Sequence, residues 1–290
     1  MKHLLAIRDL TAGDFADILE LSEAEASDRP LAGKGVALYF EKPSARTRNS
    51  MEMAVAQLGG HPIYLQRDEL GIGPRETIED VTRTLACYHA IAAARVRDHR
   101  LLDAMAAVGA LPVLNMLSDT DHPLQALADL LTVRQLCGRI EGVKVAFVGD
   151  ANNNVARSLA EGCALLGAEL TTASPDGYEL QDAPAGVRQI ADPVEAVTGA
   201  AIVYTDVWVS MGQDAEADIR RAACSPYQVH AALMAHAPDA WFLHCLPARR
   251  GEEVTADVID GARSAVWRQA ENRMHSARGA LQWLLKDWQE

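Results

Sequence analysis

The stretch Phe40-Glu41-Lys42-Pro43-Ser44-Ala45-Arg46-Thr47-Arg48-Asn49-Ser50 joins two segments of different character. Before it, residues 35–40 form an apolar run of strand length. After it, residues 51–58 are rich in helix formers and end at a Gly-Gly pair. Pro43 prevents a helix from running through the stretch, and Ser44 suits the capping position of a new helix. The pattern predicts a strand, a short loop and a helix, the unit from which α/β folds are built.

This predicted turn has the chemistry of an anion site. The first N–H groups of a helix have no partners within it, and the helix dipole makes them attractive to negative charge. Ser44 and Thr47 add hydroxyl donors, while Arg46 and Arg48 add guanidinium groups that match phosphate oxygens. The alternative is a capped helix with two solvated arginines. Two hydroxyls and two arginines so close together favour the oxyanion site, although the turn alone does not identify the anion.

The composition places the chain among globular proteins of about two domains, with 290 residues, 49% hydrophobic and 23% charged. Lys and Arg number 27 against 40 Asp and Glu, a formal charge of −13, which disfavours nonspecific binding to nucleic acid or an anionic membrane. The five cysteines include no Cys-x-x-Cys pair, which indicates reduced thiols. The first residues lack the apolar core of a signal peptide, and no segment has the length of a membrane span. We therefore expect a cytoplasmic protein that binds neither nucleic acid nor membrane.

Strand and helix patterns alternate along both halves of the chain, which predicts two doubly wound parallel-sheet α/β domains. Residues 90–95 fit either a strand or a helix by periodicity, and their shortness and terminal arginine favour a strand. In such sheets ligands collect at the carboxyl ends of the strands, so the turns that follow strands are the candidate site. We expect domains over 1–138 and 139–268, a boundary among residues 138–142, a loop over 66–75, helices over 193–197 and 226–237, and a final segment, 269–290, that is largely helical.

The turn before the helix that begins at Pro123 carries His122 and, three residues later, Gln125. Positions three apart on a helix face the same side, so both side chains can point into one pocket. A histidine at this place is equally compatible with a cap or a surface residue. Arg95, at the end of a neighbouring predicted strand, favours a binding role for His122.

Two turns in the second half follow predicted strands. A dinucleotide site needs G-x-G-x-x-G at such a place, and the turn at 149–155 has one glycine, which disfavours a nicotinamide dehydrogenase. Its three asparagines, 152–154, offer amide donors and acceptors to a ligand or cap the next helix. Asp206 follows a later strand and precedes Ser210 and Met211, and it either binds a ligand or caps a local turn.

Cys245 follows the predicted strand 241–243 and is a candidate nucleophile by position. His244 precedes it directly and, in an extended segment, would point to the opposite face. We therefore expect no Cys–His pair and favour a thiol that positions a ligand. No grouping of His, Cys and Asp shows convincing metal-ligand spacing, so we expect no metal.

Five short motifs occur in order along nearly the whole chain. They are Ser-x-Arg-Thr-Arg at 44–48, His-Pro-x-Gln at 122–125, Asp-Val-Trp-x-Ser-Met-Gly at 206–212, His-Cys-Leu-Pro at 244–247 and Glu-Asn-Arg-Met-His at 271–275. One motif alone is a weak signal, but the set resembles the aspartate/ornithine carbamoyltransferase family. The Ser-Met-Gly and His-Cys-Leu-Pro elements are similar to the ornithine branch of that family.

The resemblance implies a cofactor-free transfer of the carbamoyl group from carbamoyl phosphate to the δ-amine of L-ornithine, giving L-citrulline and phosphate in arginine biosynthesis. It implies a carbamoyl phosphate-binding first domain, an ornithine-binding second domain, a final helix that returns to the first domain, and a homotrimer. The implied catalytic residues are Arg95, His122 and Cys245. The implied carbamoyl phosphate-binding residues are Ser44, Ala45, Arg46, Thr47, Arg95, His122, Pro123, Leu124, Gln125, Cys245, Leu246 and Arg273. The implied ornithine-binding residues are Asn154, Asp206, Ser210 and Met211.

Two positions depart from the family pattern. Ala45 stands where the family commonly has Thr, a mild change because backbone N–H groups do much of the phosphate binding. Glu69 stands where the family has a loop Gln that reaches a neighbouring chain's substrate. An ionised glutamate would repel phosphate there, so we leave Glu69 out of the candidate site.

Two alternative functions remain open on sequence grounds. One is a carbamoyltransferase for another amine, such as putrescine or aspartate, and aspartate would require additional cationic groups in the second domain. The other is a noncatalytic regulator that binds a small anion with the same fold. The intact set of Arg46, His122, Gln125 and Cys245 argues against lost catalysis.

Overall fold

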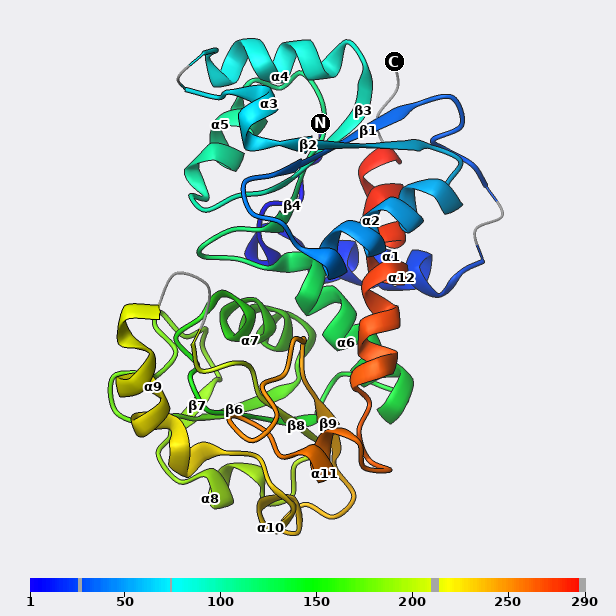
Figure 1. Ribbon diagram of the computed structural model, residues 1–290. Helices are drawn as coiled ribbons and strands as arrows, with labels where there is room; N and C mark the ends of the chain where they lie inside the picture. Colours follow the sequence, from blue (N-terminus) through cyan, green and yellow to red (C-terminus); the bar gives the residue numbers. More distant parts are fainter. Residues whose placement is uncertain (26–27, 74, 210–213, 287–290) are drawn as a thin grey trace. The chain divides into compact units, whose positions relative to one another are not determined.

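The chain forms two compact units in the computed structural model, which describes residues 1–25, 28–73, 75–209 and 214–286 (Figure 1). The first unit comprises Met1–Ala128 together with Glu271–Glu290, and the second comprises Asp129–Ala270. The divisions fall inside two helices, α6 (Pro123–Cys137) and α12 (Val266–Leu285). The first division therefore precedes the glycines at 138–142, where the sequence had suggested a boundary.

The first unit is built on a parallel sheet with strand order β2-β1-β3-β4. The chain adds β2 on one side of β1 and then β3 on the other, so the direction of winding reverses at β1. Helices α1, α2 and α12 lie on one face and α4 and α5 on the other (Figure 1). The elements are η1 Ile7–Asp9, α1 Ala12–Glu23, β1 Gly35–Phe40, α2 Ala45–Gln57, β2 His61–Gln66, α3 Arg67–Leu70, α4 Ile78–Ala86, β3 His89–Arg95, α5 Arg100–Ala107 and β4 Val113–Leu117.

The second unit repeats this plan with a parallel sheet in the order β7-β6-β5-β8-β9. Winding reverses at β5, and α7 covers the face opposite to α8, α10 and α11 (Figure 1). Both units are thus doubly wound, as the sequence predicted. The elements are β5 Lys144–Val148, α7 Asn154–Leu166, β6 Glu169–Ala173, β7 Arg188–Ile190, α8 Pro193–Val197, β8 Ile202–Tyr204, η2 Asp214–Glu216, α9 Ala217–Cys224, η3 Ser225–Tyr227, α10 Ala231–Met234, β9 Trp241–Leu243 and α11 Ala256–Ile259.

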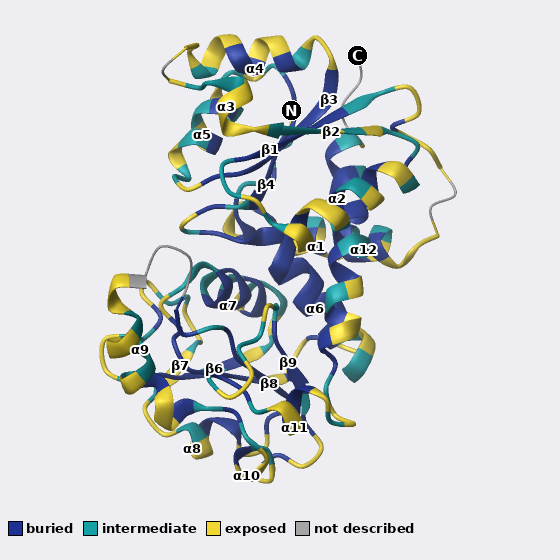
Figure 2. Ribbon diagram, in the orientation of Figure 1, coloured by how far each residue is buried: buried dark blue, intermediate teal, exposed yellow. Residues whose placement is uncertain are grey.

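Strands β1, β3 and β4 are largely buried, as Figure 2 shows. The ambiguous run at 90–95 is part of β3, and all seven of its residues are buried. Strands covered on both faces carry continuous apolar runs instead of alternating ones, which is why periodicity could not decide this segment. The strand prediction is confirmed.

The predicted helix over 226–237 is wrong for most of its length. Only the short α10 is α-helical there, because Val229 is extended and pairs with Val254 in an isolated bridge. Its N–H donates to the carbonyl of Glu253, and its carbonyl accepts the N–H of Thr255. The sequence also gave no indication of β7, α9 or the short α3 within the expected loop.

The carboxyl-terminal part of α12 packs on α1 in the first unit, as expected. Arg278 Nη2 donates to the carbonyl oxygens of Ser22 and Ala24, at 2.8 and 2.6 Å, at the end of α1. Trp283 Nε1 donates to Asp14 Oδ1 at the beginning of the same helix. These contacts satisfy backbone acceptors that a helix end leaves without partners, so the last helix is an integral part of the first unit.

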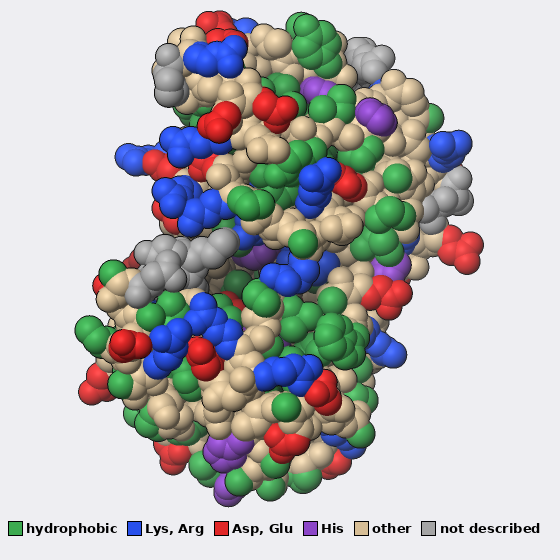
Figure 3. All heavy atoms as spheres, viewed as in Figure 1, with side chains coloured by type: hydrophobic (Ala, Val, Ile, Leu, Met, Phe, Trp, Pro, Cys, Tyr) green, Lys and Arg blue, Asp and Glu red, His purple; other side chains and the backbone are tan. Residues whose placement is uncertain are grey.

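The surface carries mixed charge on the face seen in Figure 3, where Lys and Arg side chains are interspersed with Asp and Glu. Among the described residues, no helix combines the length and apolar character that crossing a membrane requires.

Candidate active site

The turn between β1 and α2 has the capped form that the sequence predicted. Ser44 has an extended backbone, and its Oγ accepts the N–H of Thr47 at 3.4 Å. The same hydroxyl donates to Thr47 Oγ1 at 3.2 Å, and Arg95 Nη1 donates to that oxygen from the end of β3, also at 3.2 Å. Because a hydroxyl has two acceptor positions and one proton, Thr47 can still donate its proton to a ligand.

Arg95 is a buried cation at the carboxyl end of β3, only 7% exposed. Its Nε is buried and has no hydrogen-bond partner among the described residues. Burial, with repulsion from Arg273 and Arg46, lowers the pKa of Arg95 to about 10, so it stays charged at neutral pH. A buried guanidinium near two others is an electrostatically costly arrangement that a bound anion would relieve.

His122, Gln125 and Arg273 complete a polar group in the first unit, and all three are at most 7% exposed. The His122 carbonyl accepts the N–H of Gln125 at the start of α6, and Arg273 Nη1 donates to Gln125 Oε1. Burial first, then the charges of Arg273 and Arg95, lower the pKa of His122 well below 6.5. The imidazole is therefore neutral at pH 7 and can donate one hydrogen bond without carrying charge.

The other residues named for this site occupy neighbouring backbone positions. Ala45 and Pro123 begin α2 and α6, and Leu124 follows with its carbonyl bonded to the Ser276 hydroxyl. Arg46 is exposed in the first turn of α2.

Two charged residues in this region have other contacts. Arg48 pairs with Glu52 at 2.7 Å and lies 4.0 Å from the centre of the Tyr64 ring, so its guanidinium is engaged away from the turn. Glu69 accepts the N–H of Gln66 at the start of α3, which gives it a capping contact.

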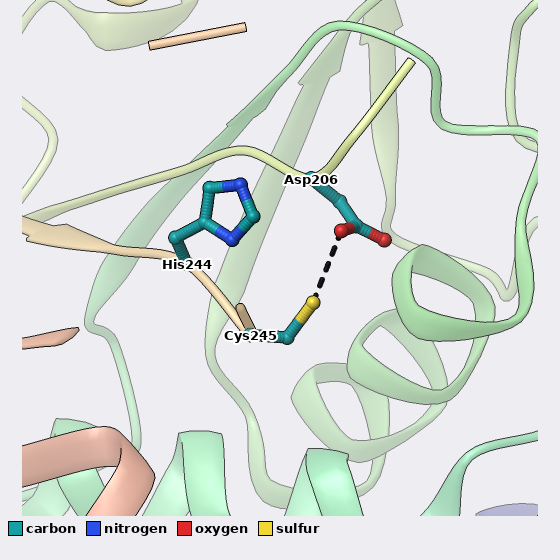
Figure 4. A group of neighbouring side chains, drawn as sticks. All are labelled: Asp206, His244 and Cys245. Atoms are coloured by element: carbon teal, nitrogen blue, oxygen red, sulfur yellow. Dashed lines mark hydrogen bonds between the residues drawn. The ribbon is translucent and has the colours of Figure 1, made fainter. Parts of the chain in front are cut away.

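The second unit holds a buried carboxylate and a thiol (Figure 4). Cys245 Sγ donates to Asp206 Oδ1 at 3.0 Å, across two strand ends, β8 and β9. Burial raises the pKa of Asp206 above 3.8, although the Cys245 hydrogen bond and the Val207 N–H oppose that rise. The pair presents an acceptor-rich group suited to an amine. The sequence predicted a thiol that positions a ligand, and the structure places the Cys245 thiol against the Asp206 carboxylate.

The structure brings together three residue types that can bind metals, a grouping that their spacing in the sequence did not indicate. Potential ligand atoms of Asp206, His244 and Cys245 lie within 4.8 Å of one another. However, His244 Nδ1 accepts the N–H of Leu246 at 2.9 Å, which leaves the proton on Nε2, and Nε2 lies 2.9 Å from Glu253 Oε1. Both ring nitrogens are therefore committed to the protein, and the group does not present the histidine ligand that a metal would need.

Leu246 has a left-handed backbone with φ of 58°, a conformation that costs a leucine roughly 1–2 kcal/mol. Its N–H is held by His244 Nδ1, and the His244 N–H donates in turn to Gln269 Oε1 at 2.9 Å. Gln269 Nε2 donates to Asp129 Oδ1 at 2.7 Å. Strained backbone fixed by buried polar contacts is typical of functional turns, and the motif gave no indication of these partners.

The asparagines in the turn after β5 have different structural roles. Asn153 Oδ1 accepts the N–H groups of Val155 and Ala156, so this residue is a helix cap. Asn154, the first residue of α7, is partly buried. Ser210 and Met211, which the sequence analysis assigned to ornithine, lie outside the described residues.

Asp150 is a buried carboxylate that no sequence motif indicated. Arg220 Nη1 donates to its Oδ2 at 2.7 Å, and burial raises the pKa of Asp150 to about 6. Its position at the carboxyl end of β5 was the available signal, since such strand ends were already the expected site.

Two family models match consecutive parts of the chain. The carbamoyl-P binding domain of aspartate/ornithine carbamoyltransferase matches residues 2–135, and the Asp/Orn binding domain matches residues 141–284. The chain belongs to the aspartate/ornithine carbamoyltransferase family.

Relatives in this carbamoyltransferase family match the chain over nearly its whole length and theirs. The ornithine carbamoyltransferase of Bacillus subtilis is 45% identical over 98% of this chain and 94% of its own. The anabolic enzyme of Pyrococcus furiosus is 45% identical over 97% and 95%. A solved structure of ornithine carbamoyltransferase from P. furiosus has a TM-score of 0.94, with 44% identity over 99% of this chain and 98% of the other.

The lowered pKa of His122 predicts how His122→Gln changes acid stability in this carbamoyltransferase-family chain. Below about pH 6.5 the unfolded chain takes up a proton on histidine, whereas the folded chain keeps it neutral. The unfolded state then binds more protons, so the free energy of unfolding falls as the pH drops, by up to about 1.4 kcal/mol per pH unit. Glutamine does not titrate, so melting curves between pH 7 and 5 should show a shallower loss for the variant. Equal slopes for the two proteins would contradict a buried neutral imidazole.

Proposed function

We propose that this chain is an ornithine carbamoyltransferase, which transfers the carbamoyl group of carbamoyl phosphate to the δ-amine of L-ornithine and releases L-citrulline and phosphate. Carbamoyl phosphate binds the first unit and ornithine the second. The observation that carries the proposal is that the first unit gathers cationic side chains, whereas the second unit holds a buried carboxylate beside a thiol. Arg95, Arg273 and the α2 turn suit a dianion, whereas the Asp206–Cys245 pair suits an amine.

The first unit's residues divide between the two ends of carbamoyl phosphate. Ser44, Thr47 and Arg46 hold the phosphate at the helix start, where N–H groups and guanidinium charge meet it. Arg95, His122 and Gln125 hold the carbamoyl group. Ala45, Pro123 and Leu124 contribute backbone positions, while Cys245, Leu246 and Arg273 complete the set of contacts.

The transfer needs charge stabilisation at two places and no covalent intermediate. When the neutral amine attacks the carbonyl carbon, the carbonyl oxygen becomes an oxyanion, and donors from Arg95, Thr47 and neutral His122 stabilise it. Arg46 stabilises the departing phosphate. Removing one preorganised donor of this kind typically costs about 2.7–4 kcal/mol of transition-state stabilisation. Holding the two reactants close together in the correct orientation lowers the activation barrier by up to about 7–11 kcal/mol in favourable cases.

Ornithine recognition is assigned to the second unit. Asp206 and Cys245 hold the reacting amine end, and Asn154 holds the amino-acid end together with Ser210 and Met211. Because the amine must be neutral to attack, Asp206 serves to position it while the thiol and burial oppose its protonation.

Phosphate binding by the α2 turn is tested by Arg46→Ala. Losing a charged donor should weaken carbamoyl phosphate binding by about 1.5–3 kcal/mol, roughly ten- to a hundredfold in Kd. The melting temperature of the unliganded protein should hardly change, because Arg46 is exposed. The matched control is Arg48→Ala, whose side chain is engaged by Glu52 and Tyr64. Calorimetric titration should show wild-type affinity for the control only; wild-type affinity in Arg46→Ala would sink the assignment.

The acceptor amine is tested by product formation with ornithine, putrescine and aspartate at several pH values. Alkyl amines titrate near 10.4, so the competent fraction of ornithine grows with pH. We expect kcat/KM for ornithine to rise from pH 6 to above 8.

The control for this experiment is Asp206→Asn, which should lose ornithine turnover and keep carbamoyl phosphate binding. Faster carbamoylation of aspartate or putrescine than of ornithine at pH 8 would overturn the choice of amine. An absence of any carbamoylated product would favour the noncatalytic alternative.

We also propose a cytoplasmic homotrimer. Met53 on α2 is 51% exposed and Ile63 on the edge strand β2 is 36% exposed, an apolar surface of the kind that chain–chain contacts cover. None of the five cysteines, all of which are described, forms a disulfide, which suits a reducing compartment. Sedimentation should give the mass of three chains, and an active monomer would rule the trimer out.

A further inference from the structure

The amino-terminal segment extends the first unit's sheet beyond β4. The Leu4 N–H donates to the Val113 carbonyl at 2.9 Å, and the Leu4 carbonyl accepts the N–H of Asn115 at 2.8 Å. Asn115 Nδ2 also donates to the Leu5 carbonyl at 2.8 Å. Main-chain and side-chain bonds therefore fix this segment along β4, immediately before the helical turn that carries Arg8.

Arg8 reaches from this segment to Asp121, which directly precedes His122. Its two terminal nitrogens donate to the two oxygens of the Asp121 carboxylate, at 2.7 and 3.1 Å. The Asp121 side chain is 0% exposed, whereas that of Arg8 is 47% exposed. The pair thus combines a fully buried carboxylate with a cation that reaches it from the surface in bidentate geometry.

The Asp121 backbone is part of the turn that places His122. Ser118 N–H donates to the Asp121 carbonyl at 2.9 Å, and Asp121 N–H donates to Ser118 Oγ at 3.1 Å. The side chain accepts the Thr120 hydroxyl, and His99 Nδ1 lies 3.5 Å from it. Removing the partner of a buried charge is strongly unfavourable, so the carboxylate has to move towards water if Arg8 is lost. Such a movement would shift the adjacent His122.

We propose that the amino-terminal segment positions His122 for the carbamoyl group through the Arg8–Asp121 ion pair. Arg8 and Asp121 are positioning residues, which touch no substrate. The inference rests on the proposed function, because it assigns His122 to the carbamoyl end of carbamoyl phosphate. Since the phosphate is assigned to Ser44–Thr47, the ion pair should affect the two ends of the ligand differently.

The test compares carbamoyl phosphate with inorganic phosphate as ligands of the whole protein. Arg8→Ala should raise the KM and Kd for carbamoyl phosphate about ten- to a hundredfold, the scale of a small misplacement of a binding group. The Kd for inorganic phosphate should stay within about twofold, and the KM for ornithine should stay unchanged. A purely structural role would weaken both anions alike or neither.

The matched control is Arg100→Ala. Arg100 also makes a bidentate pair, with Asp98, but its side chain is 87% exposed and Asp98 is 50% exposed. This control should keep wild-type values for both anions. Arg8→Lys keeps the charge and loses the bidentate fork, so it should fall between wild type and Arg8→Ala. It also keeps the test available if Arg8→Ala does not fold.

A second substitution shows whether Arg8→Ala acts through the unpaired Asp121 charge or through the loss of the arginine side chain itself. Asp121→Asn introduced into Arg8→Ala removes the unpaired charge and should recover most of the carbamoyl phosphate affinity. The proposal is overturned if Arg8→Ala or Arg8→Lys binds both anions like wild type, loses both equally, or is not rescued by Asp121→Asn. Failure of the proposed function would be seen separately, as an absence of citrulline from the wild-type protein.

Discussion

The buried positive charge of Arg95 is the constraint around which the first unit is organised. Burial at the end of a central strand, together with the charges of Arg273 and Arg46, lowers the pKa of this guanidinium to about 10, and a buried charge of this kind is unfavourable. The fold places three elements around it. The α2 turn supplies Thr47, the α6 start supplies His122 and Gln125, and α12 returns from the second unit's sequence to supply Arg273. This arrangement follows from a sheet whose winding reverses at β1, since strand ends on the two sides of such a reversal collect ligand-binding loops.

The second unit repeats the topology with the opposite electrostatic character. Its winding reverses at β5, and the strand ends there carry Asp150 and Asp206, both with raised pKa values because burial disfavours their charge. Arg220 compensates Asp150, while Asp206 is paired with a thiol, a far weaker partner. One fold plan thus yields a cationic group in the first unit and an acidic group in the second, and the difference depends on side chains at strand ends.

Local signals predicted the first turn correctly to the residue. The apolar run, Pro43 and Ser44 are enough to define β1 as Gly35–Phe40 and to place Ser44 as the cap of α2. The chemistry of the helix start predicted a binding role for Thr47, and the strand-end rule did the same for Arg95 and His122. Their roles with substrate remain predictions, but their convergence follows from parallel topology, which the alternation of strands and helices makes evident.

The features that sequence reasoning missed depend on contacts between distant positions. The segment at 226–237 has helical composition, but the bridge between Val229 and Val254 keeps part of it extended. Arg8 and Asp121 are 113 positions apart, and neither belongs to a recognisable motif. Glu253 contacts the His244 ring through its carboxylate, a pairing that no sequence pattern indicates. Propensity and periodicity carry no information about such pairings, because tertiary packing determines them.

The most direct test of a dianion site built around Arg95 is calorimetric titration of the wild-type protein with carbamoyl phosphate in the absence of any amine. The account predicts saturable binding of one carbamoyl phosphate per chain, with the affinity reduced by added salt because the contacts are ionic. An absence of saturable binding up to millimolar ligand, or binding that appears only after an amine is added, would contradict it.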